Sequence, residues 1–163
     1  MKKFFILFCF LFSISIMGCA SVTLQSSQSI VELSGLTKTQ IFEKSKQWIT
    51  YKFASGRAVM DYVDLKTGRI IAKGNITVAT VMGSRLTTDF IATIDSVNGK
   101  AKIEVLPEGC SQIAPNGNII PCECTSFYMT VSGMKNMVVS TESLVQSYVS
   151  YMKDGKAQSW DGN

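Results

Sequence analysis

The chain contains no histidine among its 163 residues. This absence excludes Ser-His-Asp and Cys-His catalysis and every metal site that uses a histidine ligand. Carboxylate or lysine chemistry stays open. The composition therefore disfavours an enzyme without ruling one out, and it predicts no cofactor.

A strong charge of one sign is also missing. The formal charge is +4, and subtracting Lys2 and Lys3 of the N-terminal segment leaves only +2. No long run of like charges appears, and no basic patch interleaves with aromatic residues. The glycines at 68, 74, 83 and 99 match no phosphate-binding spacing. The balance gives no support to a nucleic-acid or anionic-lipid partner.

No hydrophobic run is long enough to cross a membrane. The apolar stretch from Phe4 to Met17 falls short of the ~20 residues that a spanning helix needs. Lys2 and Lys3 precede this stretch and the small Gly18 follows it. This layout predicts a secretory signal peptide over residues 1–18.

The end of the signal, Ile16-Met17-Gly18-Cys19, resembles the lipobox of bacterial lipoproteins. The resemblance implies cleavage after Gly18, a thioether-linked diacylglycerol on Cys19 and acylation of the new amine. The alternatives are an ordinary cleavable signal or an uncleaved anchor.

Small and polar residues fill positions 19–29, which predicts a flexible tether to a single domain over residues 30–155. No Asp follows Cys19, and no acid precedes Glu32. By resemblance to lipoprotein sorting signals, this favours the outer membrane, with the protein facing the periplasm. Residues 156–163 are expected to form a loose tail.

Two segments have the spacing of amphipathic helices. In the first, Thr37 and Gln40 form a capping box ahead of a stripe. The second is predicted to begin at Ser140 or Thr141 and to end at Gly155. The apolar stripes are Ile41, Trp48, Ile49 and Phe53 in the first, and Leu144, Val145, Tyr148, Tyr151 and Met152 in the second. An aromatic residue on such a stripe, like Trp48, is expected in the core.

Alternating apolar and polar residues predict strands. They cover Ile30–Leu33, Ala58–Asp64, Arg69–Ala79, Arg85–Val97 and Lys100–Leu106, and Cys122–Val131 is a possible further strand. The stretch 107–121 predicts a long loop or an irregular hairpin, and Asn98-Gly99 is a hairpin turn. An antiparallel sheet with one dry and one solvated face is expected, with both helices on the dry face. The fold class is therefore α+β.

At this point the chain resembles a family of uncharacterised bacterial lipoprotein domains with a TBP-like fold. The resemblance lies in Gly35-Leu36-Thr37-Lys38 before the Trp48 helix, in the turn from Asp64 through Gly68-Arg69 to Gly74, and in the Asn98-Gly99 hairpin. It implies the order β-α-β(4)-α, and the cysteine-bearing insert at 107–124 departs from the pattern. The family offers no catalytic residues to carry over. The term TBP-like names a shape and implies nothing about DNA.

The cysteines Cys110, Cys122 and Cys124 remain once Cys9 leaves with the signal and Cys19 is lipidated. In an exported protein we expect a disulfide from Cys110 to Cys122 or Cys124. A metal site of three thiolates is the alternative, but it lacks a fourth ligand, and no metal is predicted.

The solvated face of the sheet is the predicted interaction surface. Alternation places on it Lys73, Asn75, Thr77, Arg85, Thr87, Asp89, Thr93 and Asp95. The plain alternative is an ordinary wet sheet face. The sequence thus favours a lipid-anchored, non-enzymatic module that binds another envelope protein or a small ligand. The alternatives are a hydrolase or transferase using Asp89, Asp95 or a lysine, and a purely structural envelope protein.

Overall fold

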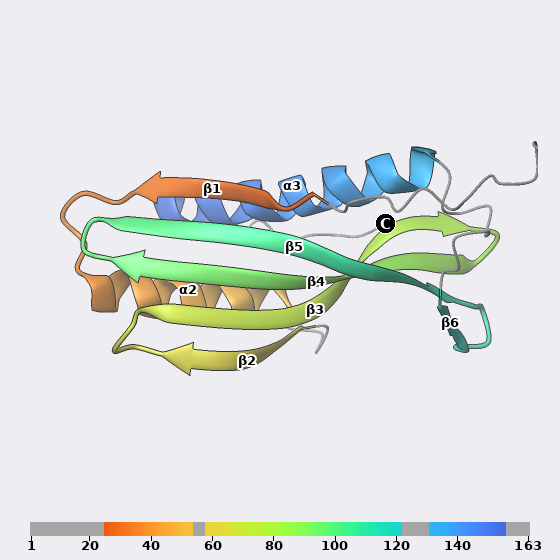
Figure 1. Ribbon diagram of the computed structural model, residues 1–163, viewed down its shortest axis with the longest axis horizontal. Helices are drawn as coiled ribbons and strands as arrows, with labels where there is room; N and C mark the ends of the chain where they lie inside the picture. Colours follow the sequence, from red (N-terminus) through yellow and green to blue (C-terminus); the bar gives the residue numbers. More distant parts are fainter. Residues whose placement is uncertain (1–24, 54–57, 122–130, 156–163) are drawn as a thin grey trace, which may run out of the picture.

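The computed structural model describes residues 25–53, 58–121 and 131–155. The elements are β1 (Ser27–Glu32), α2 (Lys38–Lys52), β2 (Ala58–Asp64), β3 (Arg69–Val81), β4 (Ser84–Val97), β5 (Lys100–Ile113), β6 (Ile119–Pro121) and α3 (Val131–Asp154). The strands form one antiparallel sheet in the order β1-β5-β4-β3-β2, and β6 pairs with β5. Both helices lie behind the same face of this sheet (Figure 1). The predicted α+β class and TBP-like arrangement are confirmed.

The start of α2 is fixed by the predicted capping box. The Thr37 backbone N–H donates to Gln40 Oε1 at 2.9 Å, and the Gln40 N–H donates to Thr37 Oγ1 at 3.4 Å. The Lys38 N–H donates to Asn98 Oδ1 at 2.8 Å. Because Asn98 lies in the β4–β5 turn, this bond ties the first turn of the helix to one end of the sheet.

The core lies between the two helices and the sheet. Trp48 and Tyr148 are buried and meet edge to face, with ring centroids 5.1 Å apart. Ser45 Oγ lies 2.9 Å from the Tyr148 hydroxyl and donates to the Ile41 carbonyl at 2.8 Å. The Tyr148 hydroxyl therefore donates to Ser45, which satisfies a polar group that burial would otherwise penalise. The predicted core positions of Trp48, Leu144 and Tyr148 are confirmed.

Of the two predictions for 107–121, the irregular hairpin is confirmed and the long loop is wrong. β5 continues through Pro107 to Ile113, and β6 returns after a turn at 114–118. Phe90 pairs with Pro107 while Asp89 pairs with Gly109, so Glu108 is an extra residue in β5. Proline is tolerated at such a bulge, and the strand continues beyond it. Most of the predicted strand Cys122–Val131 lies outside the described residues, and Val131 belongs to α3.

The first and the last elements, β1 and α3, both begin earlier than predicted. β1 begins at Ser27 rather than Ile30, and α3 begins at Val131 rather than at Ser140 or Thr141. Thr141 is a buried mid-helix residue whose hydroxyl donates to the Val138 carbonyl at 2.9 Å and lies 3.0 Å from Ser27 Oγ. The residue predicted to cap the helix thus fastens β1 to α3 instead. The C-cap at Gly155, with φ +69°, is confirmed.

The β2–β3 turn needs glycine at position 68. Gly68 has φ +80°, its N–H donates to the Asp64 carbonyl at 2.9 Å, and its own carbonyl accepts from the Ser96 N–H at 2.8 Å. A Cβ at this position would collide with the Ser96 carbonyl oxygen. Close approach and a left-handed backbone therefore both require glycine here.

Gly68→Ala is expected to lower the free energy of unfolding by about 2 kcal/mol or more, because strain of ~1–2 kcal/mol in the left-handed region is added to the collision with Ser96. Gly99→Ala is the matched control. Gly99 has φ +73°, but a Cβ there meets nothing within 4 Å. Chemical denaturation should separate the two variants, and equal losses would show that the contact with Ser96 contributes nothing.

Candidate binding surface

One face of the sheet is left uncovered by the described helices. In β3 and β4 the positions Ile70, Ala72, Ala92 and Ile94 are buried toward α2 and α3. Their alternating neighbours point the other way. We call this opposite side the outer face; by strand register it carries Gln28, Ile30, Glu32, Tyr62, Asp64, Arg69, Ile71, Lys73, Ile91, Thr93, Asp95, Lys102, Glu104 and Leu106.

A row of charges crosses the outer face near the β2–β3 and β4–β5 turns. Arg69 lies opposite Asp64 on one side and Asp95 on the other. Its Nε donates to Asp95 Oδ1 at 2.7 Å and its Nη2 to Asp95 Oδ2 at 3.0 Å, which is a bidentate pair. These hydrogen bonds and the Asp95 charge raise the pKa of Arg69 above its ordinary value.

Asp64 is held by its own turn rather than by Arg69. Its carboxylate accepts from Thr67 Oγ1 at 2.7 Å, from the Lys66 N–H at 2.8 Å and from the Tyr62 hydroxyl at 3.2 Å. These bonds, with that from Thr67 largest, lower the pKa of Asp64. The side chains of this corner are therefore oriented before any partner arrives.

The remaining charges on and beside the outer face are mostly paired. Lys73 meets Asp61 at 3.1 Å, Lys102 meets Glu104 at 3.1 Å and Lys100 meets Glu32 at 3.0 Å. All are substantially exposed, so each contributes little to stability. Because the charges compensate locally, the face lacks the concentrated positive potential that nucleic acid requires.

A hollow of about 510 Å³ opens on this face beside β2. Its lining residues are Tyr62, Thr67, Arg69, Ile71 and Asp95. Ile71 gives it an apolar surface, while hydroxyl, guanidinium and carboxylate groups surround it. A protrusion with one apolar and one polar group would find complementary contacts here.

The predicted interaction residues divide into two groups. Lys73, Thr93 and Asp95 lie on the outer face around this hollow. Arg85 and Asp89 lie farther along β4, where Arg85 pairs with Thr80 and Ile113. Six residues separate Asp89 from Asp95, which is ~20 Å along a strand. The structure therefore does not bring these two carboxylates together as an acid–base pair, which needs a separation below ~10 Å.

The expected exposure of Thr87 is wrong. Thr87 is only 3% exposed, and its hydroxyl donates to the Ser111 carbonyl at 3.1 Å. Its hydroxyl thus satisfies a carbonyl in the neighbouring part of β5, which was predicted as a long loop or an irregular hairpin. Tyr62, Thr67, Arg69 and Ile71 were not predicted as site residues. The sequence feature that could have indicated them is the segment Asp64-x-x-Thr67-Gly68-Arg69, which by itself predicts only a turn.

Asp89, six positions along β4 from Asp95, is a carboxylate with a raised pKa. Partial burial is the larger cause of the raised pKa, and the charge of the nearby Glu108 is the smaller one. Ionised Asp89 therefore opposes folding, and this cost appears as the pH rises from the ordinary value of 3.8 through the raised pKa.

Asp89→Asn is accordingly expected to stabilise the domain at neutral pH by a few tenths of a kcal/mol, discounted because the group is partly solvated. The gain should shrink as the pH falls below the raised pKa. Asp95→Asn, which breaks the bidentate pair with Arg69, is the control and should lose stability. Thermal melts of both variants across pH 3–7 measure this, and a gain that persisted at pH 3 would contradict the assigned cause.

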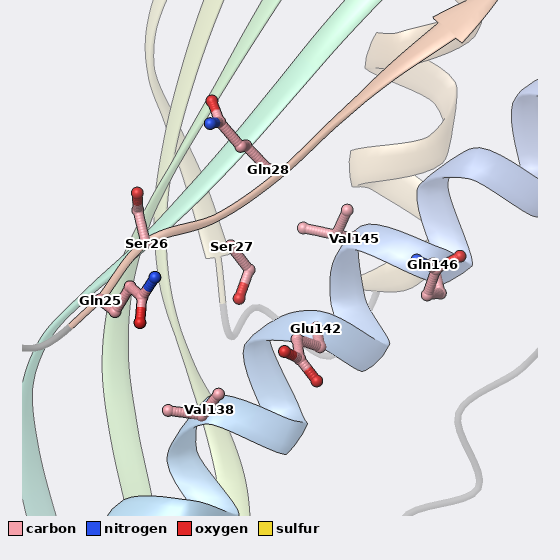
Figure 2. Close-up of a pocket in the computed structure, with 8 residues that line it drawn as sticks. All are labelled: Gln25, Ser26, Ser27, Gln28, Val138, Glu142, Val145 and Gln146. Carbon is pink, nitrogen blue, oxygen red and sulfur yellow. The ribbon is translucent and has the colours of Figure 1, made fainter.

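A second hollow, of about 460 Å³, lies between the start of β1 and α3 (Figure 2). It was not predicted. Ser27 points from β1 toward α3 in Figure 2, where it meets Thr141. Amides, hydroxyls and one carboxylate dominate the lining, which suits a neutral polar ligand: Gln25, Ser26, Ser27, Gln28, Val138, Glu142, Val145 and Gln146.

Other predicted sites are tested only in part. Cys110 lies in β5 opposite Thr88, while Cys122 and Cys124 fall outside the described residues, so the disulfide stays a prediction. Cys19 also falls outside them. Within the described ranges, no group of three His, Cys, Asp or Glu side chains could hold a metal ion. In the same part of the chain, no helix is long and apolar enough to cross a membrane.

Comparison with known proteins agrees with this architecture. The family model described as "Domain of unknown function (DUF4468) with TBP-like fold" matches residues 28–105. A DUF4468 family protein from Bacteroides ovatus superposes with a TM-score of 0.59 at 13% identity, covering 87% of this chain and 94% of that one. A TBP-like protein from Parabacteroides distasonis gives 0.57 at 12%, covering 86% and 99%. No curated protein matches the chain. At these identities the solved structures support the fold alone.

Proposed function

We propose that the chain, whose residues 28–105 match the family model of the DUF4468 domain with TBP-like fold, is a lipid-anchored envelope protein that binds another envelope protein through its outer face. The observation that carries this proposal is the outer face itself. It is one whole side of a five-stranded path of the sheet, and no described helix covers it.

The chemistry of the outer face suits a protein partner. Locally compensated ion pairs alternate with exposed apolar side chains, including Ile30 at 60% and Tyr62 at 45% exposure. Charged groups at an interface mainly select the partner and its orientation, while apolar and aromatic groups supply affinity. The hollow at Arg69 gives this surface a feature that a partner side chain can enter.

A non-enzymatic role is supported by what the carboxylates do. Asp64 and Asp95 are occupied by hydrogen bonds and an ion pair, and Asp89 lies far from both. A catalytic acid or base needs free reach to a substrate and a partner group nearby. A hydrolase or transferase that used Asp95 would require a substrate to displace Arg69 from this carboxylate.

Attachment to the membrane is supported by the N-terminal sequence. We place the acyl chains on Cys19 and the protein at the outer membrane, facing the periplasm. Two or three acyl chains would make attachment effectively permanent, since each buried CH₂ contributes ~0.8 kcal/mol. The residues between Cys19 and β1 then set how far the domain stands from the bilayer.

Cys19→Ser is expected to abolish lipidation and release the protein from the membrane fraction. Cys9→Ser is the matched control, because Cys9 lies inside the predicted signal and should leave with it. Intact mass of the membrane-extracted control should begin at a modified Cys19. Recovery of Cys19→Ser in the membrane fraction with the same lipid modification as the control would contradict the anchor at Cys19.

The partner surface is tested by removing one ion pair from each side of the domain. Arg69→Ala with Asp95→Ala removes the pair on the outer face, whereas Glu43→Ala with Lys46→Ala removes an exposed pair of α2, 3.1 Å long, on the opposite side. Crosslinking in intact cells followed by mass spectrometry should recover a partner about tenfold less with the outer-face variant, equivalent to ~1.4 kcal/mol. The helix-side variant should match the wild type.

Equal recovery of the same partner with both variants would show that the outer face is not the binding surface. Thermal melts of both variants are the accompanying control, because two exposed pairs should cost little and similar stability.

A further inference from the structure

The sheet has a charged end and an uncharged end. All the ion pairs of the outer face lie toward the β2–β3 and β4–β5 turns. At the opposite end, within residues 74–88 and 109–121, Arg85 is the only charged residue. We call this opposite end the distal end; it comprises the β3–β4 turn, the β5–β6 turn and β6, seen at the right of Figure 1.

The distal end also exposes large apolar side chains. Met82 at the tip of the β3–β4 hairpin is 97% exposed, and Ile119 and Ile120 of β6 are 69% and 51% exposed. The two turns lie together, since a Cβ on Gly83 would sit 3.5 Å from Pro115 Cγ. Exposed apolar groups gathered in a region with almost no charge are uncommon on a surface that faces only water.

Met82 occupies its position against the preference of its backbone. Val81 pairs with Ser84, which leaves Met82 and Gly83 as a two-residue turn with φ +49° and +77°. Such turns favour Asn at the first position, because a left-handed conformation costs stability in a residue like Met. Because Met82 is strained and almost fully exposed, it does not stabilise the domain, which points to a role in contacts with another molecule.

The length of the N-terminal segment relates the distal end to the membrane. Ser27 lies opposite Val105, and β1 runs antiparallel to β5, so the N-terminal end of β1 faces the distal end. Eight residues separate Ser27 from Cys19, so the two can be at most ~28 Å apart. Along β5, Ile113 lies ~27 Å beyond Val105, and the hairpin tip lies ~10 Å farther. With the distal end toward the bilayer, Met82 lies ~37 Å beyond Ser27 and is therefore at least as deep as Cys19 even when the segment is fully stretched.

We propose that the distal end contacts the lipid bilayer, with Met82, Ile119 and Ile120 inserted at its surface. The inference rests on the proposed lipid anchor at Cys19. Apolar side chains partition into the interface. Arg85 is the one charged residue in the strands behind them and takes part in none of the ion pairs of the described residues, so no ion pair has to be desolvated. The other end of the sheet, with its Glu32–Lys100 and Arg69–Asp95 pairs, would have to desolvate them.

The test uses the full-length lipidated protein in phosphatidylcholine vesicles whose acyl chains carry bromine, a quencher of tryptophan fluorescence. Met82→Trp places a reporter at the tip. Val97→Trp is the matched control, since Val97 is 52% exposed and lies ~50 Å from Met82 at the other end of β4. Relative to wild type, which contributes Trp48 and Trp160 in all samples, the added signal of Met82→Trp should be quenched at least about twofold and that of Val97→Trp should not.

Flotation of the vesicles separates the two levels of the hypothesis. Protein that fails to float shows that the anchor, and with it the proposed function, is wrong. Protein that floats while both reporters are quenched equally, or not at all, overturns the membrane contact and leaves the anchor standing.

Met82→Asn gives an independent readout. Asn suits the left-handed turn, so the melting temperature should rise by about 4 °C. Hydrogen exchange of the backbone amides of residues 81–84 should be slowed by vesicles in the wild type and less so in this variant. Equal slowing in both proteins would show that Met82 makes no contact with lipid.

Discussion

The edge-to-face contact of Trp48 with Tyr148 lies at the centre of the domain, and the placement of the other elements follows from it. Trp48 comes from α2 and Tyr148 from α3, and both rest on the same face of the sheet. Ser45 satisfies the Tyr148 hydroxyl inside this contact. Once the two helices are joined in this way, they cover one face of the sheet together, and the other face is left to solvent.

One-sided burial explains the chemistry of the outer face. Residues there need only tolerate water, so ion pairs such as Arg69–Asp95 stand beside exposed apolar groups such as Tyr62. The turn at Gly68 pins this corner to Ser96 and orients Asp64 and Arg69 together. A surface of this kind is free to select a partner without disturbing the core, which is why a binding role fits the domain better than buried catalysis.

The lengths of the strands add a second feature. β3 has 13 residues and β4 and β5 have 14 each, whereas β1 has 6 and β2 has 7. The longer strands continue past the short ones and form the distal end. If the distal end rests on the bilayer, as we propose, the outer face stands away from the membrane surface and stays open to a protein in the periplasm. The lipid anchor and the distal end would then hold the domain in an orientation that leaves the outer face accessible.

The sequence by itself determined the elements that depend on local periodicity and turn chemistry. The alternation in β3 and β4, the capping box of Thr37 and the stripes through Trp48 and Tyr148 all report a buried face that a local pattern must encode. These are sufficient to predict the α+β class and the side of the sheet that carries the helices.

Only the tertiary structure decided what depends on neighbours distant in sequence. Pro107 looks like the end of a strand, but pairing with β4 carries β5 through it by a bulge. Thr141 resembles an N-cap in the sequence, but in the structure it is buried and its hydroxyl forms a hydrogen bond with Ser27 of β1. The hollow at Arg69 joins residues of β2, β3 and β4, and the approach of Gly83 to Pro115 brings the β3–β4 and β5–β6 turns together. Strand register brings such residues together, and register is set by long-range pairing that no local pattern contains.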